Sequence, residues 1–416
     1  MKITQELRRE AKRLGWKTLK KEQIQPIRAL MKGRDCLMIY PVAFGKSAIF
    51  QLPALCQKTG AWTLVIEPTL ALIYDQVRHL QARGIAAAFL TGVNGEEQEK
   101  VLADVRNGEI TILYVTPERL CQKDFRCGIE AVPPWLVAVD EAHCVLDWGD
   151  TFRKCYLKIG AILDTLPQRP VIAALTATAP PDCRKKICKA LHMKKAEIFF
   201  RGMRGDNLTI LKRDCEGISE ERRLKLLVKY IEKYRKEGKT VIYCLSRKSV
   251  DLVANYLKKA VGETVAKCHG FMEVEQREKQ VLAFMQGKRR IMVATSAFGM
   301  GVDLPDIRLV IHAQMPLSAV DYIQQIGRAG RDGAPAHAAL LYSRNDGKLG
   351  RYILDQGDLS KHVRRQMEER LIEMEHIVQG DACLMAQLRT ALGESEAADC
   401  GRCTNCQKRR KQHERD

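Results

Sequence analysis

A strand-like apolar run leads directly into residues that suit phosphate binding. Residues 36–40 (CLMIY) are followed by Pro41-Val42-Ala43-Phe44-Gly45-Lys46-Ser47 and then by a helical pattern beginning AIFQLPAL. A phosphate needs backbone N–H donors from a turn and a helix start, a lysine for its charge, and a hydroxyl that ligates magnesium. Gly45, Lys46 and Ser47 supply these parts and predict a phosphate loop. An ordinary strand-to-helix turn is the alternative for this segment alone.

A pair of acids follows another apolar run. Residues 136–139 (LVAV) lead into Asp140-Glu141-Ala142-His143, and acids at the carboxyl end of a parallel strand lie where such sheets bind ligands. We expect Asp140 to hold magnesium and Glu141 to orient or deprotonate an attacking water, which gives hydrolysis. A capped helix start would also explain the four residues alone. Their combination with Lys46 argues against that alternative.

Two arginines lie three residues apart among glycines in 324–333 (QQIGRAGRDG). On a helix, Arg328 and Arg331 would share a face. If these arginines lie in one lobe of the protein and reach a phosphate bound to another lobe, their charge stabilises the transition state. Hydrolysis then depends on closure of the two lobes. The alternative is a solvated basic turn.

A cysteine cluster lies near the end of the chain. Cys400, Cys403 and Cys406 follow one another at two-residue spacing, and Cys383 lies upstream on a helix-like stretch. Four thiolates suit tetrahedral zinc, whereas the closely spaced triplet also suits an iron–sulfur cluster, and unligated thiols are a third possibility. A closed four-thiolate site leaves no position for water, so we expect a role in folding and in supporting a binding surface, not in catalysis.

Two series of short apolar runs must position these groups. The first comprises 36–40, 63–67, 111–115, 136–140 and 171–178, and the second comprises 241–246, 290–295, 309–315 and 338–343. Alternation with helical patterns predicts buried parallel strands in two α/β lobes. The polar stretch 201–207 separates the series, and the pattern is mostly helical after about Lys348.

Composition limits the class of partner. The 416 residues include 69 Lys plus Arg against 50 Asp plus Glu, a net charge of +19 that favours nucleic acid, although a membrane surface is also anionic. No apolar run is long enough to span a membrane, and the charged start lacks a secretion signal. We therefore expect a cytoplasmic protein, nucleoid-associated if bacterial. The 15 cysteines are too few for a disulfide scaffold.

The chain resembles the RecQ family of superfamily 2 DNA helicases over nearly its whole length. The matching segments are 14–23 (LGWKTLKKEQ), 44–47 (FGKS), 67–77 (EPTLALIYDQV), 113–120 (LYVTPERL), 137–153 (VAVDEAHCVLDWGDTFR), 174–179 (ALTATA), 294–312 (ATSAFGMGVDLPDIRLVIH) and 322–333 (YIQQIGRAGRDG). The resemblance implies an α/β fold of two RecA-like parallel-sheet lobes and a small helical zinc-binding module. We expect the ATP-binding lobe at 1–205, the second lobe at 206–348, and the zinc module with a basic tail at 349–416.

The resemblance also implies roles for individual residues. Trp16, Lys20 and Gln23 match an adenine-reading motif, and Gly45, Lys46, Ser47, Asp140 and Glu141 match residues for ATP phosphates, magnesium and water. Gln324, Arg328 and Arg331 match the motif that reaches the γ-phosphate, while Thr176 and Thr178 match a coupling segment. Trp148, Phe152 and Arg153 match an aromatic-rich loop that senses single-stranded DNA. Zinc at Cys383, Cys400, Cys403 and Cys406 is the ligand set that the family favours.

The implied activity is ATP-driven 3′→5′ movement on single-stranded DNA with duplex unwinding, in recombination and repair. ATP, Mg²⁺ and Zn²⁺ are the expected cofactors, and single-stranded and partly duplex DNA the expected substrates. We expect a monomer, no membrane partner, and an accessory DNA-binding protein as a possible partner. An RNA helicase, or a DNA-binding regulatory protein with weak ATP turnover, remains an alternative.

Three departures from the family carry expectations. Val42, Ala43 and Phe44 replace the family's T-G-G, and a side chain there obstructs close approach of backbone to phosphate. Asp150-Thr151 replaces a His-Asp pair, so we expect weaker coupling of DNA binding to hydrolysis. Because the chain stops at Asp416, we expect unwinding without the family's winged-helix and terminal helical domains. The tail residues Lys408, Arg409, Arg410 and Lys411 could touch duplex phosphates or form a solvated basic tail.

Overall fold

Buried parallel strands organise the unit Met1–Arg201. The computed structural model describes residues 5–41, 44–57, 60–91, 95–146, 151–203, 205–234, 237–262, 265–298, 304–357, 359–395 and 397–414. The first sheet has the strand order β3-β4-β2-β5-β6-β1-β7, with parallel pairing throughout the described strands. Its strands are β1 (Cys36–Ile39), β2 (Thr63–Ile66), β3 (Ala87–Leu90), β4 (Ile112–Val115), β5 (Leu136–Val139), β6 (Val171–Thr176) and β7 (Glu197–Phe200).

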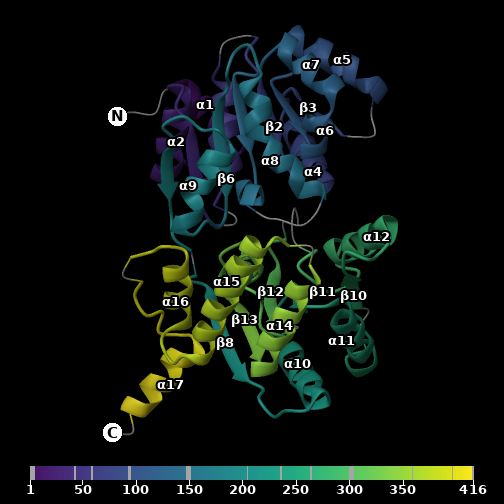
Figure 1. Ribbon diagram of the computed structural model, residues 1–416, viewed down its shortest axis with the longest axis vertical. Helices are drawn as coiled ribbons and strands as arrows, with labels where there is room; N and C mark the ends of the chain where they lie inside the picture. The colour runs from purple at the N-terminus through teal and green to yellow at the C-terminus, as the bar shows by residue number, and fades with distance from the viewer. Residues whose placement is uncertain are drawn as a thin grey trace. The chain divides into compact units, whose positions relative to one another are not determined.

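Helices cover both faces of this sheet because its central strands are apolar on both sides. Along β1, Leu37 and Ile39 enter one buried cluster, while Cys36 and Met38 enter the other. Figure 1 shows helices flanking the strands of this unit. They are α1 (Gln5–Arg13), α2 (Lys21–Met31), α3 (Ser47–Leu55), α4 (Leu70–Gln81), α5 (Gly95–Arg106), α6 (Pro117–Cys121), α7 (Lys123–Ala131), the 3₁₀ helix η1 (Ala142–Leu146), α8 (Thr151–Asp164) and α9 (Pro181–Ala190).

The unit Gly202–Asp416 contains a second parallel sheet. Its strand order is β10-β11-β9-β12-β13-β8. The strands are β8 (Leu208–Asp214), β9 (Lys239–Tyr243), β10 (Val265–Cys268), β11 (Ile291–Ala294), β12 (Ile307–His312) and β13 (Ala336–Tyr342). The helices are α10 (Glu220–Tyr234), α11 (Arg247–Ala260), α12 (Val274–Met285), α13 (Ala319–Ile326), α14 (Arg344–Gln356), α15 (Lys361–Gln379), α16 (Leu384–Ala391) and α17 (Thr404–His413).

The C-terminal helices share a core with the second sheet. Leu371 and Met374 of α15 and Leu388 of α16 lie in the same buried cluster as Val310 of β12 and Leu340 of β13. The helical module is therefore built onto one face of this sheet. These observations confirm the α/β fold class, with two parallel sheets followed by a helical module, whereas the domain boundaries stay a prediction. Among the described residues, no helix is long and apolar enough to cross a membrane.

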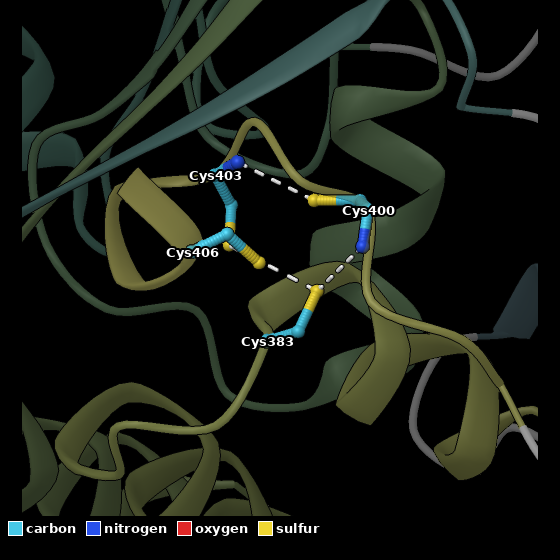
Figure 2. Close-up of side chains that lie close together, drawn as sticks. All are labelled: Cys383, Cys400, Cys403 and Cys406. Carbon is cyan, nitrogen blue, oxygen red and sulfur yellow. Dashed lines mark hydrogen bonds between the residues drawn. The ribbon is translucent and has the colours of Figure 1, made fainter. Parts of the chain in front are cut away.

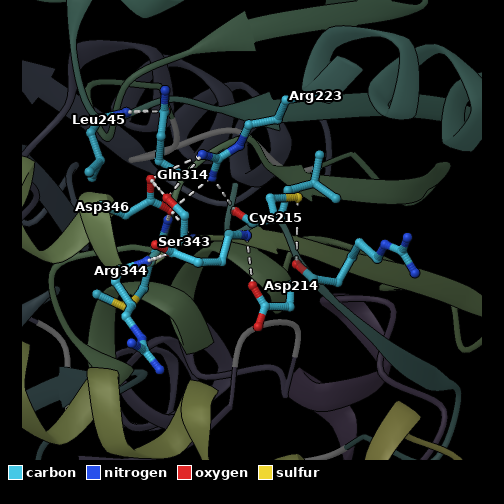
Figure 3. Close-up of polar contacts among 12 residues, drawn as sticks. Asp214, Cys215, Arg223, Leu245, Gln314, Ser343, Arg344 and Asp346 are labelled. Atoms are coloured by element: carbon cyan, nitrogen blue, oxygen red, sulfur yellow. Dashed lines mark hydrogen bonds and ion pairs between the residues drawn. The ribbon is translucent and has the colours of Figure 1, made fainter. Parts of the chain in front are cut away.

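A buried ion pair joins α10 to the start of α14 (Figure 3). The Arg223 guanidinium donates to Asp346 Oδ2 at 2.8 Å and Oδ1 at 3.2 Å, and also to the carbonyl oxygen of Leu341 at 2.8 Å. Asp346 further accepts from the backbone amides of Met315 (3.0 Å) and Ser343 (3.1 Å). The Asp346 side chain is only 4% exposed. Through these hydrogen bonds, its carboxylate connects the segments that follow β12 and β13 to α10 and to the start of α14.

Replacing Asp346 by alanine should strongly destabilise the second unit. Asp346→Ala leaves the Arg223 charge without its buried carboxylate, a loss that typically costs about 3–5 kcal/mol of unfolding free energy. Urea unfolding of the full chain measures the effect. As a control, Glu221→Ala removes an exposed ion pair with Lys225 and should leave the transition almost unchanged. An equally small effect of both substitutions would contradict the structural role of Asp346.

Candidate functional site

The expected phosphate loop connects β1 to α3. Tyr40 donates its backbone N–H to the Thr176 carbonyl oxygen at 3.0 Å, which continues the β1–β6 pairing, and α3 begins at Ser47. Lys46 lies at the N-cap of α3. Ser47 and Lys46 therefore lie at a helix start, where unpaired backbone N–H groups suit an anion. Val42 and Ala43 lie outside the described residues.

Gly45 lets the adenine-motif residues pack against this loop. Its φ of +85° is in the left-handed region, and a Cβ there would come within 2.5 Å of Trp16 Cη2 and 2.8 Å of Gln23 Nε2. Gln23 donates to the carbonyl oxygen of Gly45 at 3.0 Å and accepts from the backbone amide of Lys20 at 2.9 Å. The structure thus brings Trp16, Lys20 and Gln23 to the loop, while their contact with adenine stays a prediction.

The side chain of Phe44 packs into the core of the unit. Phe44 is 2% exposed, and its ring centroid lies 4.9 Å from that of Tyr40. Lys20 Nζ lies 4.3 Å from the Phe44 ring centroid, a cation–π geometry. The phenylalanine that replaces a family glycine therefore links the loop to the adenine motif, a contact that the sequence did not indicate. Obstruction of a phosphate by this segment stays a prediction.

The acid pair lies at the carboxyl end of β5. The Glu141 backbone N–H donates to Asp140 Oδ1 at 2.8 Å, and Glu141 has a φ of +45°. A non-glycine residue in that region is strained, and such strain concentrates at functional sites. Burial raises the pKa of Asp140, and the charge of Lys46 partly offsets that rise. Lys46 and Asp140 therefore belong to one electrostatic site.

His143 connects this acid pair to the segment after β6. Its Nδ1 lies 3.3 Å from Glu141 Oε2 and 3.0 Å from Thr176 Oγ1. Thr176 Oγ1 in turn accepts from the Thr178 backbone amide at 3.2 Å. A single imidazole ring thereby contacts both Glu141 and Thr176. The resemblance to the RecQ family implied roles for Thr176 and Thr178, but it did not indicate that His143 contacts both Thr176 and Glu141.

A third carboxyl group, Glu67, lies beside the acid pair. It directly follows β2 and is 2% exposed. Burial first, and then the charges of Asp140 and Glu141, raise the pKa of Glu67 well above its usual range. The sequence analysis did not single out this residue. The rule that identified Asp140, an acid directly after a buried parallel strand, applies equally to Glu67.

The arginines of the second unit lie beyond a helix rather than on one. α13 ends at Ile326, and the segment containing Arg328 and Arg331 is a turn in which Gly330 has a φ of +64°. Burial raises the pKa of Tyr243, whereas the positive charges of Arg328 and Arg331 lower it. Both arginines therefore lie near the Tyr243 ring. Gln324 lies in the last turn of α13. Contact of these residues with a phosphate stays a prediction.

The DNA-sensing loop is only partly described. Trp148 and Asp150 lie outside the described residues. Thr151, Phe152 and Arg153 begin α8, but their side chains also lie outside the described part of the structure. Their roles toward DNA stay predictions.

The four C-terminal cysteines converge (Figure 2). The sulfur atoms of Cys383, Cys400, Cys403 and Cys406 all lie within 4.8 Å of one another. Cys403 Sγ lies 3.9 Å from Cys383 Sγ and 3.5 Å from Cys406 Sγ. Zinc–sulfur bonds of about 2.3 Å in a tetrahedron require sulfur separations of about 3.8 Å, so the cluster fits zinc.

Neighbouring donors support thiolates in this cluster. Backbone amides donate to Cys383 Sγ from Cys400 (3.2 Å) and to Cys400 Sγ from Cys403 (3.3 Å). The Arg409 guanidinium lies 3.6 Å from Cys406 Sγ. Such surrounding donors orient metal ligands and balance their charge. Arg409 of the basic tail thus contacts the cluster, whereas Lys408, Arg410 and Lys411 are exposed.

Family models match three successive parts of the chain. Residues 20–186 match the DEAD/DEAH box helicase model, residues 222–333 the helicase conserved C-terminal domain, and residues 344–407 the RecQ zinc-binding model. Among solved structures, Dbp5 of S. cerevisiae bound to RNA and ADP BeF3 has a TM-score of 0.69 at 18% identity, covering 89% of this chain and 98% of that one. The DUF1998 helicase MrfA bound to DNA and AMPPNP has a TM-score of 0.67 at 17% identity, covering 93% and 56%.

Curated relatives match across most of the chain. The ATP-dependent DNA helicase RecQ of Bacillus subtilis is 34% identical, covering 96% of this chain and 66% of that protein. The protein of the same name from Haemophilus influenzae is 32% identical, covering 94% and 62%. The probable ATP-dependent DNA helicase RecS of Bacillus subtilis is 32% identical, covering 82% and 67%. The chain thus spans less than two thirds of the length of the first two relatives.

Two RecA-like parallel sheets, which match the DEAD/DEAH box helicase model and the helicase conserved C-terminal domain, define a superfamily 2 helicase core. A four-cysteine module follows that core. The chain belongs to the RecQ family.

The cysteine cluster should hold about one zinc ion per chain. Cys403→Ser removes a buried ligand, and structural zinc can contribute roughly 10 kcal/mol or more to folding, so the variant should lose zinc and aggregate. Elemental analysis and thermal unfolding measure these effects. Cys127→Ser, at an exposed cysteine outside the cluster, should leave both unchanged. Iron with visible absorption, or wild-type protein without metal, would rule out the zinc site.

Proposed function

We propose that this chain hydrolyses ATP to move 3′→5′ along single-stranded DNA and to unwind duplex DNA. The observation that carries the proposal is the electrostatic site formed by Lys46, Asp140 and Glu141 beside the phosphate loop, in a chain of the RecQ family. The curated relatives are named ATP-dependent DNA helicases. Their polarity and their role in recombination and repair come to this chain as part of the proposal.

Each residue of the first lobe has a distinct task in the proposed hydrolysis. Lys46 neutralises phosphate charge, and the N–H groups at the start of α3 hold phosphate oxygens. Glu141 orients the attacking water and accepts its proton. The charge of Lys46 lowers the pKa of Asp140, and Ser47 directly follows Lys46. The Ser47 hydroxyl and the Asp140 carboxylate, both suited to magnesium, would therefore belong to one site. Bound magnesium would stabilise charge that develops on the phosphate oxygens.

The link from Glu141 through His143 to Thr176 and Thr178 supports coupling of hydrolysis to movement. We propose that Gln324, Arg328 and Arg331 contribute to the same reaction from the second lobe, where arginine charge stabilises the transition state. Trp16, Lys20 and Gln23 would select adenine, and Trp148, Phe152 and Arg153 would sense the single strand by stacking and charge. Hydrolysis would then alternate the grip of the two lobes on DNA.

DNA is the proposed substrate on the strength of family membership, because RecA-like lobes do not by themselves distinguish the sugars. The second candidate is an RNA helicase, favoured by the likeness of the fold to Dbp5, whose structure was solved with RNA. We further propose a monomer that acts with an accessory DNA-binding protein, in the cytoplasm and on the nucleoid if the source is bacterial. The net charge of +19 supports backbone binding without sequence specificity.

Two substitutions should separate binding from hydrolysis. Lys46→Ala should remove both tight ATP binding and turnover, because it deletes the phosphate-neutralising charge. Glu141→Gln should still bind ATP but hydrolyse it roughly 10²- to 10⁴-fold more slowly, because the general base is lost. Steady-state hydrolysis and equilibrium binding of fluorescent ATP measure the two effects. Glu130→Gln, at an exposed carboxylate of α7, serves as the control, and wild-type turnover by Glu141→Gln would overturn the assignment.

Strand separation should require a 3′ single-stranded overhang. A 3′→5′ translocase loads on that overhang and runs into the duplex, whereas a 5′ overhang directs it away and a blunt end offers no loading strand. Matched 3′-overhang, 5′-overhang and blunt duplexes test the polarity, with salt varied because phosphate contacts weaken as counterions compete. Preference for the 5′ overhang would show that the proposed polarity is wrong. Equal unwinding of the blunt duplex would show that no loading strand is needed.

A further inference from the structure

A single amide side chain holds the turn that follows the two-arginine motif of the second unit. Asn207 directly precedes β8, in the segment through which the chain enters this unit after Arg201. Its Nδ2 atom donates to the carbonyl oxygens of Gly330 and Ala334, both at 2.8 Å. An amide NH₂ group has two N–H donors, so Asn207 uses both of them on this one turn.

The backbone on each side of this contact is tied to the second sheet. The Ala336 amide at the start of β13 donates to the carbonyl oxygen of Asn207 at 2.9 Å. The Gly330 amide donates to the carbonyl oxygen of Ile307, the first residue of β12, also at 2.9 Å. The Asn207 side chain therefore bridges a turn whose two ends are attached to the neighbouring strands β12 and β13.

Gly330 suits the close approach of Asn207. Its φ of +64° lies in the left-handed region, and a Cβ there would come within 2.7 Å of the Ala334 carbonyl oxygen and closer still to Asn207 Nδ2. A side chain at this position would displace the amide. Arg328 lies two residues before Gly330, and Arg331 directly follows it. A shift of the turn would therefore move the backbone that carries both arginines.

The segment before Asn207 is held in turn by the cysteine module. Glu394, which follows α16, accepts from the backbone amide of Met203 through its Oε1 atom at 2.8 Å. Arg402, between two cysteines of the cluster, donates to the carbonyl oxygen of Asp206. Met203 also lies in the buried cluster that the module shares with the second sheet. The amide of Asn207 thus extends from a segment that is anchored on its other side.

We propose that Asn207 is a positioning residue that holds the turn 328–334 in the geometry from which Arg328 and Arg331 act on the nucleotide. The inference rests on the proposed function of these arginines. A misplacement of about 1 Å, caused far from the chemistry, can lower turnover by about 100-fold. Because arginine charge acts mainly as the transition state forms, a displaced turn should lower kcat and leave ATP binding nearly unchanged.

Steady-state hydrolysis of ATP by the full chain, with saturating single-stranded DNA, tests the proposal. Asn207→Ala removes both donors, and Asn207→Asp replaces them with an oxygen that repels the two carbonyl groups. Both substitutions should lower kcat by about 10- to 100-fold and leave KM for ATP within about twofold of the wild-type value. Thermal unfolding of each variant shows that it is folded at the temperature of the assay.

A double-mutant cycle separates positioning from a general structural effect. If Asn207 acts through the arginines, Asn207→Ala should lower kcat clearly less in an Arg331→Ala background than in the wild-type chain. Asp206→Asn is the matched control, because it changes the adjacent side chain, which is 93% exposed and forms only a surface ion pair with Arg402. The control should retain the wild-type kcat.

Each outcome decides the proposal. Wild-type kcat in both Asn207 variants would overturn it, and so would an equal fold loss in the wild-type and Arg331→Ala backgrounds, which indicates a general structural effect. If the wild-type chain does not hydrolyse ATP, or if Arg331→Ala keeps wild-type turnover, the proposed function of the arginines fails and the inference fails with it. A lower kcat at an unchanged KM, with a smaller loss in the Arg331→Ala background, supports the positioning role.

Discussion

The in-register pairing of parallel strands brings the proposed site residues of the first unit to one edge of its sheet. Because all strands of the first sheet run in one direction, every residue that directly follows a strand emerges at the same edge. That single constraint places the proposed phosphate loop after β1, Glu67 after β2, Asp140 and Glu141 after β5, and Thr176 at the end of β6, all at the carboxyl edge of the sheet. Two hydrogen bonds of 3.0 Å add to this arrangement. One joins the Gln23 side chain to the carbonyl oxygen of Gly45, and the other joins the His143 ring to Thr176 Oγ1.

The helical module is likewise positioned by a parallel sheet, the sheet of the second unit. Its apolar residues enter the buried cluster of the second sheet, and the four cysteines lie in that cluster or pack against it. Lys212 of β8 donates its backbone amide to Thr404 Oγ1 at 2.8 Å and its ammonium to the carbonyl oxygens of Val378 and Gly380. A metal at the cysteines would therefore stabilise the attachment of α15–α17 to the sheet as well as the local fold.

Much of this architecture could be predicted from the sequence, and the omissions have a common cause. Every strand that the apolar runs predicted is present, whereas β3 and β7 at the edges of the first sheet, and β8 and β10 at the edges of the second, were not predicted. Edge strands have one neighbour and tolerate polar residues, such as Lys212 and Arg213 in β8 and Lys267 in β10, which weakens their apolar signal. This reason does not apply to β3 (Ala87–Leu90), which is apolar but only four residues long. The cysteine spacing predicted the cluster that the structure brings together, and motif spacing singled out Lys46, Asp140 and Glu141, whose roles stay predictions. The packing of Phe44, the contacts of His143 and the contact of Arg409 with Cys406 depend on tertiary neighbours, which spacing does not reveal.

The central claim is that the carboxyl edge of the first sheet forms an ATP site whose turnover depends on DNA. Hydrolysis of ATP by the purified full chain, measured without nucleic acid, with single-stranded DNA and with single-stranded RNA of the same sequence, tests that claim most directly. The account predicts slow turnover alone and clear stimulation by DNA, with less by RNA. No hydrolysis under any condition, or a rate that is the same with and without DNA, would contradict it.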